Sequence, residues 1–388
     1  MRIAIFYKYF RKYGGQEKVI YNLAHFLAKK GFDVEVYAKK IFDQPEDGKI
    51  KVNRVFVPFG GSVGVLWFAL YSFFKAKSLK KRYSDICILG FGKTFYQDIY
   101  RSGGGVHKFY FERAKKKYST KIGRLFYTFR KKILPYHWTV RFIEYLIFKN
   151  PDLKAVIAPS EFVKKQIVDI FGFDEDKIVI IRNGVDLRRF KPDEKKAIKL
   201  KDKIDAKDKF VLSFVSTNHR LKGLEYLLKA LRLLIDQGIN NFKLVVAGSG
   251  DEPYFKKLIK KLGLDDYVII YGKIKDIEKI YKMSDVFVYP TLFDTSALVV
   301  LEAMACSCIP VVSRYCGSSE IIENGRNGFI IDKPDNPQEI ATLLKSILQR
   351  QINIDQIKQQ AINSLLKFEL SGGFEKIEKL ILDRCFTD

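Results

Sequence analysis
The chain has 388 residues, of which 47 % are hydrophobic, and a formal net charge of +25. This length allows two domains of ordinary size. The positive charge suits nucleic acid, an anionic membrane or a polyanionic substrate, but the sequence contains no zinc-finger spacing, aromatic RNA-binding signature or helix-turn-helix pattern. The longest apolar run, Val63 to Phe74, is too short to span a bilayer.

The cysteines form an odd and unclustered set of five: Cys87, Cys306, Cys308, Cys316 and Cys385. Their spacing does not match zinc ligands, and such a set in a chain of this size is typical of a reducing compartment. The apolar segment at the beginning of the sequence is interrupted by Lys8, Arg11 and Lys12, so we expect no signal peptide. The sequence therefore predicts a reduced, cytosolic protein.

Strands alternate with helices from the start, which is typical of parallel, doubly wound sheets. The first unit comprises a strand (residues 2–7), a glycine turn (Gly14 and Gly15), a helix that ends at Gly31 and a second strand (residues 33–38). The two glycines would let the backbone approach a diphosphate closely. They do not spell G-x-G-x-x-G, which argues against a dinucleotide. Further strands are expected at residues 52–58, 86–90 and 155–160 and in the segment K-I-V-I-I that precedes Arg182.

The segment between residues 60 and 79 is rich in aromatic residues and is expected to be a core helix. A hydrophobic lip for a lipid acceptor is the alternative. After the next strand, the glycines 103–105 place His107 beside a backbone that a ligand can approach closely. Open α/β sheets bind ligands at such strand ends, so His107 is the histidine with the most site-like setting. Asp98 is the competing candidate for the same role.

Residues 108–149 combine twelve basic residues with only two acids, Glu112 and Glu144, and with many aromatic rings. Basic groups and amphipathic rings repeated with a helical period are typical of a segment that lies on a membrane surface. We therefore expect this segment to contact an anionic membrane. A solvated basic face over a core and a nucleic-acid surface are the alternatives, and we expect no nucleic acid.

The second half repeats the alternation, after a charged run at residues 193–209 that is expected to be an exposed linker or edge. Strands are predicted at residues 210–215, 243–248, 268–271, 286–289 and 309–312. Arg220 and Lys222 come just before a predicted helix, where cations and the helix dipole together favour a diphosphate.

A pair of acids flanks the start of the helix that follows the strand at residues 286–289. Asp294 lies on the loop before this helix, and Glu302 lies inside it. The amides of residues 297–299 at the helix start form an anion site. Carboxylates accept charge-assisted hydrogen bonds from sugar diols, so this unit offers a phosphate site with an acid on each side.

Four motifs carry a family resemblance: G-G-x-E at Gly14, N-G-V-D at Asn183, K-G at Lys222, and D-T-S-A-L-V-V-L-E-A-M-A at Asp294. They resemble the retaining GT-B glycosyltransferases of family four, and most of all the lipopolysaccharide-core glucosyltransferases. The resemblance implies an α/β chain with two facing Rossmann-like domains, residues 1–186 and 187–369, and an active site in the cleft between them. A tail helix, residues 370–388, would pack back onto the first domain.

The resemblance also implies an activity: metal-independent, retaining transfer of a hexose from a nucleoside diphosphate sugar, expected to be UDP-glucose. The acceptor would be a glycolipid such as lipopolysaccharide core, at the inner face of the cytoplasmic membrane. The implied catalytic residues are Asp294, His107, Lys222 and Arg220. The implied donor-binding residues are Gly14, Gly15, Lys273, Ile274, Ala297, Leu298, Val299 and Glu302. A non-catalytic, membrane- or nucleic-acid-associated binding protein with a degenerate donor site is the alternative.

Overall fold

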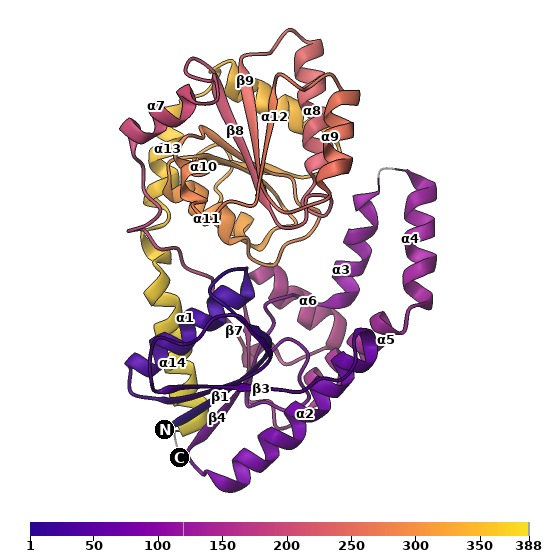
Figure 1. The fold of residues 1–388 in the computed structure, drawn as a ribbon, viewed down its shortest axis with the longest axis vertical. Coiled ribbons are helices and arrows are strands. Elements are labelled where there is room, and N and C mark those ends of the chain that lie inside the picture. The colour runs from indigo at the N-terminus through magenta and orange to yellow at the C-terminus, as the bar shows by residue number, and fades with distance from the viewer. Residues whose placement is uncertain (119, 387–388) are drawn as a thin grey trace. The chain divides into compact units, whose positions relative to one another are not determined.

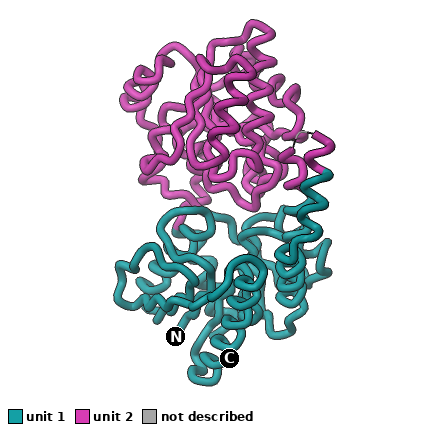
Figure 2. The backbone as a smooth tube through the Cα atoms, turned by 45° about the vertical axis from the view of Figure 1, so that its right-hand side comes forward, with its two compact units in different colours: residues 1–112, 125–183, 371–388 teal, residues 113–124, 184–370 magenta. Residues whose placement is uncertain are grey.

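The structure is a computed structural model that describes residues 1–118 and 120–386 (Figure 1). They divide into two compact units (Figure 2). The first unit contains residues 1–112 and 125–183 and the chain from Ser371 onward, and the second contains residues 113–124 and 184–370. The sequence does not anticipate that residues 113–124 belong to the second unit. Ser119 and residues 387–388, which fall in two of the predicted segments, lie outside the described residues.

The first unit is built on a seven-stranded parallel sheet with the order β3-β2-β1-β4-β5-β6-β7. Its strands are β1 (Arg2–Phe10), β2 (Asp33–Ile41), β3 (Ile50–Arg54), β4 (Ile86–Phe91), β5 (Ile99–Arg101), β6 (Ala155–Ala158) and β7 (Ile178–Ile180). The strand order reverses between β1 and β4. Ligands of open α/β sheets bind at this kind of switch point, beyond the carboxyl ends of the strands.

Helices follow these strands as the alternating pattern predicts. They are α1 (Gln16–Lys29), α2 (Gly61–Arg82), α3 (His107–Ala114), α4 (Lys121–Ile133), α5 (Pro135–Lys149) and α6 (Glu161–Phe171). Local signals set their ends. The Ser160 hydroxyl caps α6 by accepting a hydrogen bond from the Val163 amide at 3.3 Å, and Gly172 ends the helix in the left-handed region with φ 58°.

Helix α2 is only half a core helix. One face, including Phe68 and Leu79, is buried, whereas Trp67 and Phe74 are exposed. The expectation of a core helix is therefore correct for one face and wrong for the other. No helix in the described parts of the chain combines the length and apolarity that crossing a membrane requires.

The second unit is built on a six-stranded parallel sheet with the order β10-β9-β8-β11-β12-β13. Its strands are β8 (Phe210–Ser216), β9 (Phe242–Gly248), β10 (Val268–Gly272), β11 (Val286–Tyr289), β12 (Ile309–Ser313) and β13 (Phe329–Ile331). The order reverses between β8 and β11, so this unit has a switch point of the same kind. The predicted two Rossmann-like domains are confirmed.

The helices of this unit are α7 (Glu194–Asp202), α8 (Leu224–Asp236), α9 (Glu252–Lys261), α10 (Glu278–Lys282), α11 (Leu298–Ala305), α12 (Pro337–Leu348) and α13 (Ile354–Asn363). Helix α7 corrects the expectation that the charged run is a linker or edge. Asp193 caps it by accepting a hydrogen bond from the Lys196 amide at 3.1 Å, and Lys201 forms an ion pair with Asp285 at 2.6 Å. The run is helical rather than irregular, but no residue of α7 is buried, so the predicted exposure of this helix is correct.

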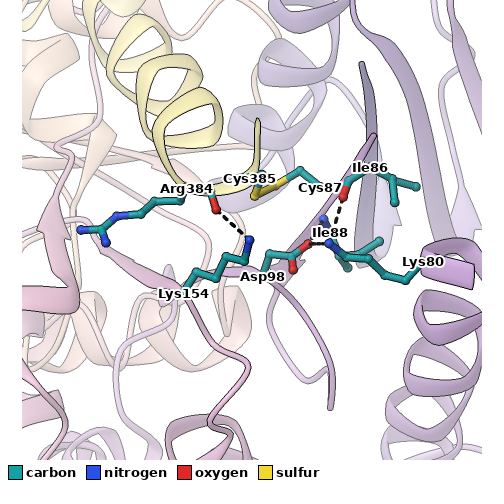
Figure 3. Close-up of a disulfide and its surroundings, with 8 residues drawn as sticks. All are labelled: Lys80, Ile86, Cys87, Ile88, Asp98, Lys154, Arg384 and Cys385. Carbon is teal, nitrogen blue, oxygen red and sulfur yellow. Dashed lines mark hydrogen bonds and ion pairs between the residues drawn. A yellow bond between two sulfur atoms is a disulfide. The ribbon is translucent and has the colours of Figure 1, made fainter. Parts of the chain in front are cut away.

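The C-terminal helix α14 (Leu370–Ile381) belongs, from Ser371 onward, to the first unit. Glu378 pairs with Lys30 of α1 at 3.5 Å. A disulfide joins Cys385, just after α14, to Cys87 in β4, with the two Cα atoms 5.6 Å apart (Figure 3). The expectation of a fully reduced set of cysteines is therefore wrong. The sequence separation of 298 between the two cysteines hides their proximity from any reading of local spacing.

We expect alkylation of the denatured, non-reduced chain to modify the three free cysteines, Cys306, Cys308 and Cys316, and to modify all five only after reduction. Intact mass measures the number of labels. The variant Cys385→Ser should gain one label at Cys87 without reductant, whereas the control Cys306→Ser should lose one. Full labelling of the unreduced wild-type chain would contradict the crosslink.

Candidate functional site
The switch point of the second unit brings two loops into backbone contact. Gly223, at the start of α8, has φ 83°, and a methyl group on it would collide with the carbonyl oxygen of Pro290 after β11. Only glycine allows this approach. The Leu292 amide also donates to the carbonyl of Leu221 at 3.0 Å. The K-G motif therefore places the loop after β8 directly against the loop after β11.

This packing joins two residues that the sequence singled out separately. Lys222 Nζ donates to Asp294 Oδ2 at 2.5 Å and to the Phe293 carbonyl at 2.9 Å. The hydroxyl of Tyr289, the last residue of β11, donates to the same carboxylate oxygen at 2.9 Å. Burial and the adjacent Asp294 raise the pKa of Tyr289, so its hydroxyl stays a donor. The Asp294 carboxylate and the Lys222 ammonium are therefore fixed next to each other at the end of the buried strand β11.

Helix α11 begins beside this pair. Its N-cap residue, Ala297, offers no side-chain cap. The Val300 amide donates to the Ala297 carbonyl at 3.0 Å, whereas the amides of the first two helical residues have no acceptor within the helix. These amides, those of Leu298 and Val299, give the helix start its affinity for anions. Glu302, within α11, is buried and accepts a hydrogen bond from Tyr281 Oη at 3.3 Å.

The other predicted residues of this unit lie on neighbouring loops. Arg220 donates twice to Asp251 Oδ2, at 3.0 and 2.7 Å, and its guanidinium lies 3.6 Å from the centre of the Tyr254 ring. It therefore points to the loop after β9 rather than to Asp294. Lys273 is exposed and Ile274 is half-buried, and both follow the edge strand β10.

Arg113 contacts the loop after β11 that carries Asp294. The sequence did not predict this contact. Its Nε donates to the Leu292 carbonyl at 3.1 Å, and its guanidinium lies 3.2 Å from the centre of the Tyr315 ring. The carbonyl of Tyr315 in turn accepts the Asp294 amide at 2.9 Å. Burial lowers the pKa of Arg113. Because Arg113 precedes Leu292 by 179 positions, no local pattern could have found this contact.

In the first unit, the predicted glycine turn lies at the carboxyl end of β1, next to the switch point. Gly14 has φ 103°, and a methyl group on it would lie 2.8 Å from Glu17 Oε2. Gly15 is the N-cap residue of α1. Glu17 is buried and pairs with Arg11 at 3.3 Å. Local packing thus explains the G-G-x-E motif, because Gly14 lets the Glu17 side chain fold back over the turn.

His107 begins α3 and is held by two contacts. Its Nε2 lies 2.7 Å from His137 Nδ1 of α5, so one nitrogen donates and the other accepts. Its amide donates to the buried Glu144 at 3.0 Å, and Glu144 also pairs with Lys93 at 2.5 Å. The structure therefore adds His137 as a partner that the sequence did not suggest.

Burial, and next the charge of Lys93, lower the pKa of His107 to about 3. We expect this imidazole to stay neutral from pH 8 to pH 5, although a free histidine has a pKa of about 6.5. Because only the unfolded chain gains this proton, the contribution of His107 makes folding less favourable as the pH falls below about 6.5. Long-range ¹H–¹⁵N spectra, assigned with His107→Gln, measure the titration. A midpoint near 6.5 would contradict the expectation.

Asp98, the competing candidate, lies at the amino end of β5, opposite the edge where ligands of such sheets bind. Its buried carboxylate accepts the Ile88 amide at 2.7 Å and pairs with Lys80 at 2.8 Å (Figure 3). It also lies within 4.8 Å of the ligand atoms of Cys87 and Cys385. The two sulfurs are bonded to each other, and the Asp98 carboxylate is paired with Lys80, so these three side chains do not fit a metal ion. Asp98 has a structural role.

Two family models match the chain in succession. Glycosyltransferase Family 4 matches residues 13–189, and Glycosyl transferases group 1 matches residues 194–364. Among curated proteins, an uncharacterized glycosyltransferase, MJ1607, of Methanocaldococcus jannaschii is 34 % identical over 48 % of this chain and 48 % of its own length. The UDP-Gal:alpha-D-GlcNAc-diphosphoundecaprenol alpha-1,3-galactosyltransferase of Escherichia coli is 29 % identical over 54 % and 55 %. The chain thus spans about half the length of the curated relatives it matches.

Solved structures match over nearly the whole chain. WaaG, a glycosyltransferase involved in lipopolysaccharide biosynthesis, has a TM-score of 0.79 at 18 % identity and covers 98 % of this chain and 99 % of its own. Anabaena HepE in complex with UDP and glucose has a TM-score of 0.72 at 19 % identity, with the same coverage. At these identities the likeness establishes the fold. That fold is GT-B. The two family models together cover residues 13–189 and 194–364, so the chain belongs to the glycosyltransferases of family 4 and group 1.

Proposed function
We propose that the protein transfers a hexose from a nucleoside diphosphate sugar, with UDP-glucose as the donor. The observation that carries this proposal is the Lys222–Asp294 pair beside the start of α11. A lysine and free helix amides suit a diphosphate, and an adjacent carboxylate suits sugar hydroxyls. The HepE structures with UDP and glucose and with UDP-glucose support this choice of donor.

In this proposal different residues of the second unit bind different parts of the donor. Lys222, Arg220 and the first amides of α11 stabilise the charge that develops on the leaving phosphate. Asp294 orients the sugar hydroxyls, Glu302 binds the ribose diol, and the backbone at Lys273 and Ile274 holds the base. Cations and a helix dipole thus supply the charge stabilisation without a metal ion.

The residues of the first unit serve the donor phosphates and the reacting sugar. Gly14 and Gly15 let the backbone approach the donor diphosphate closely, and the neutral His107 is a hydrogen-bond partner for the sugar. The acceptor attacks on the face from which the phosphate leaves, so the anomeric configuration is retained. An inverted anomer in the product, observed by NMR, would rule out this course.

The proposed acceptor is a membrane-anchored glycan such as lipopolysaccharide core, reached from the inner face of the cytoplasmic membrane. An exposed apolar face on α4 supports this proposal. It consists of Ile122, Leu125, Phe126, Phe129 and Ile133, which recur at helical spacing. Five basic residues lie on the same helix: Lys121, Arg124, Arg130, Lys131 and Lys132. Apolar and basic groups together favour an anionic lipid surface.

The donor is tested by incubating the purified protein with UDP-, GDP- and ADP-sugars and measuring the released nucleotide. We expect release from UDP-glucose, unchanged by a chelator. Thermal shift with UDP separates the enzyme from a binding protein with a degenerate donor site. No stabilisation at millimolar UDP, together with no nucleotide release, would sink the proposal.

A further inference from the structure
Arg101, the last residue of β5, is a buried cation without an acidic partner. Only 4 % of its surface is exposed. Its Nη2 donates to Asn183 Oδ1 at 2.7 Å, a neutral acceptor. Across residues 1–118 and 120–386, no carboxylate pairs with this guanidinium, and its buried Nε has no hydrogen-bond partner.

Such an arrangement is costly for the folded chain. A buried charge needs an opposite charge or a full set of hydrogen bonds, because the interior solvates it poorly. Burial lowers the pKa of Arg101 to about 10, so the group still carries its charge at neutral pH. Glu17, the acid that follows Gln16 in the chain, does not balance it, because its carboxylate is already paired with Arg11 at 3.3 Å.

A second unsatisfied donor points to the same place. A methyl group built on Gly103 would lie 2.8 Å from Gln16 Nε2 and 2.9 Å from Arg101 Nη1. Gln16 Nε2 is buried and, within the described chain, also lacks a hydrogen-bond partner. The φ of Gly103 is outside the left-handed region, so its backbone conformation does not require glycine. The side chains of Gln16 and Arg101 instead pack directly over Gly103, where a β-carbon would displace them and where the two donors converge.

We propose that Arg101 and Gln16, which converge over Gly103, form a binding site for a phosphate group carried by the acceptor. This inference builds on the proposed transferase function. The donor diphosphate already has its counter-charges in the second unit, at Lys222 and the start of α11. An unbalanced guanidinium in the first unit, at the carboxyl end of a strand, therefore serves a different anion. Phosphate suits the geometry, because it accepts from a guanidinium and an amide together.

The site is tested with inorganic phosphate and glycerol 3-phosphate as probes. In spectra of arginine Nε groups, we expect either probe to shift the Arg101 signal, which Arg101→Met identifies by its absence. Gly103→Ala would displace both donors without removing a charge and should weaken phosphate binding about tenfold or more. Gly104→Ala is the matched control, since a methyl group there meets nothing within 4 Å and should leave binding unchanged.

UDP provides the second arm of the experiment. Gly103→Ala should keep the thermal shift that UDP produces, which also shows that the variant is folded. Equal phosphate binding in wild type, Gly103→Ala and Arg101→Met would overturn the site. A loss of UDP binding in folded Gly103→Ala would overturn the assignment to the acceptor. Phosphate binding that depends on Arg101, in a chain that does not bind UDP, would support the site while contradicting the proposed donor.

Discussion
Replacing Lys222 with methionine is expected to lower kcat about a hundredfold or more. The ammonium lies 2.5 Å from Asp294 beside the start of α11, where the leaving phosphate would gain charge. Removing one preorganised donor to a developing charge costs about 2.7–4 kcal/mol, which is a factor of about 10² to 10³. Methionine preserves the length of the side chain, so the loss would report the charge rather than packing.

A double-mutant cycle makes this prediction specific. Asp294→Asn removes the partner of Lys222, and because the two side chains are in contact, we expect their losses not to add in the double variant. Lys256→Met is the matched control, since this exposed lysine of α9 also pairs with an acid, Glu252, at 2.8 Å. We expect it to retain wild-type kcat. Additive losses, or normal turnover in Lys222→Met, would contradict a joint role on the donor.

The elements that hold this pair could be predicted from local pattern. Strand β11 has the predicted bounds, and α11 begins one residue after the predicted start at Ala297. Buried parallel strands form continuous apolar runs, and glycine and proline mark their ends, so such signals are local. Because carboxyl ends of adjacent parallel strands meet at one edge, the meeting of Lys222 and Asp294 follows from the topology.

Contacts between distant parts of the chain could not be predicted in this way. Arg113 contacts the loop that carries Asp294, and Cys385 is bonded to Cys87. Both contacts result from tertiary packing, which produces no periodic pattern in the sequence. Arg101 was not singled out from the sequence, because its lack of an acidic partner is visible only when all its neighbours are known. The exposed face of α2 was missed for a related reason, since apolar composition alone does not reveal which face is covered.

Replacing Leu125, Phe126 and Phe129 together with serine is expected to lower partition onto anionic vesicles about a hundredfold or more. Full burial of each such side chain contributes about 1.5–3 kcal/mol, and partial insertion into the lipid interface retains part of this. Flotation with phosphatidylglycerol-containing vesicles measures the loss. The loss should persist at high salt, whereas changing Lys131 and Lys132 to glutamine should weaken binding mainly at low salt, because salt screens exposed charges.

The chain offers a matched pair of leucines as the control. Leu125 of α4 is 72 % exposed and Leu366 is 70 % exposed, so serine at either position removes a similar apolar surface from solvent. Only Leu125→Ser should reduce vesicle binding, because only Leu125 lies among the basic and aromatic residues of α4. Equal losses for the two variants would mean that general surface apolarity, rather than this helix, drives adsorption. Binding that is the same on neutral phosphatidylcholine vesicles would remove the case for an anionic lipid.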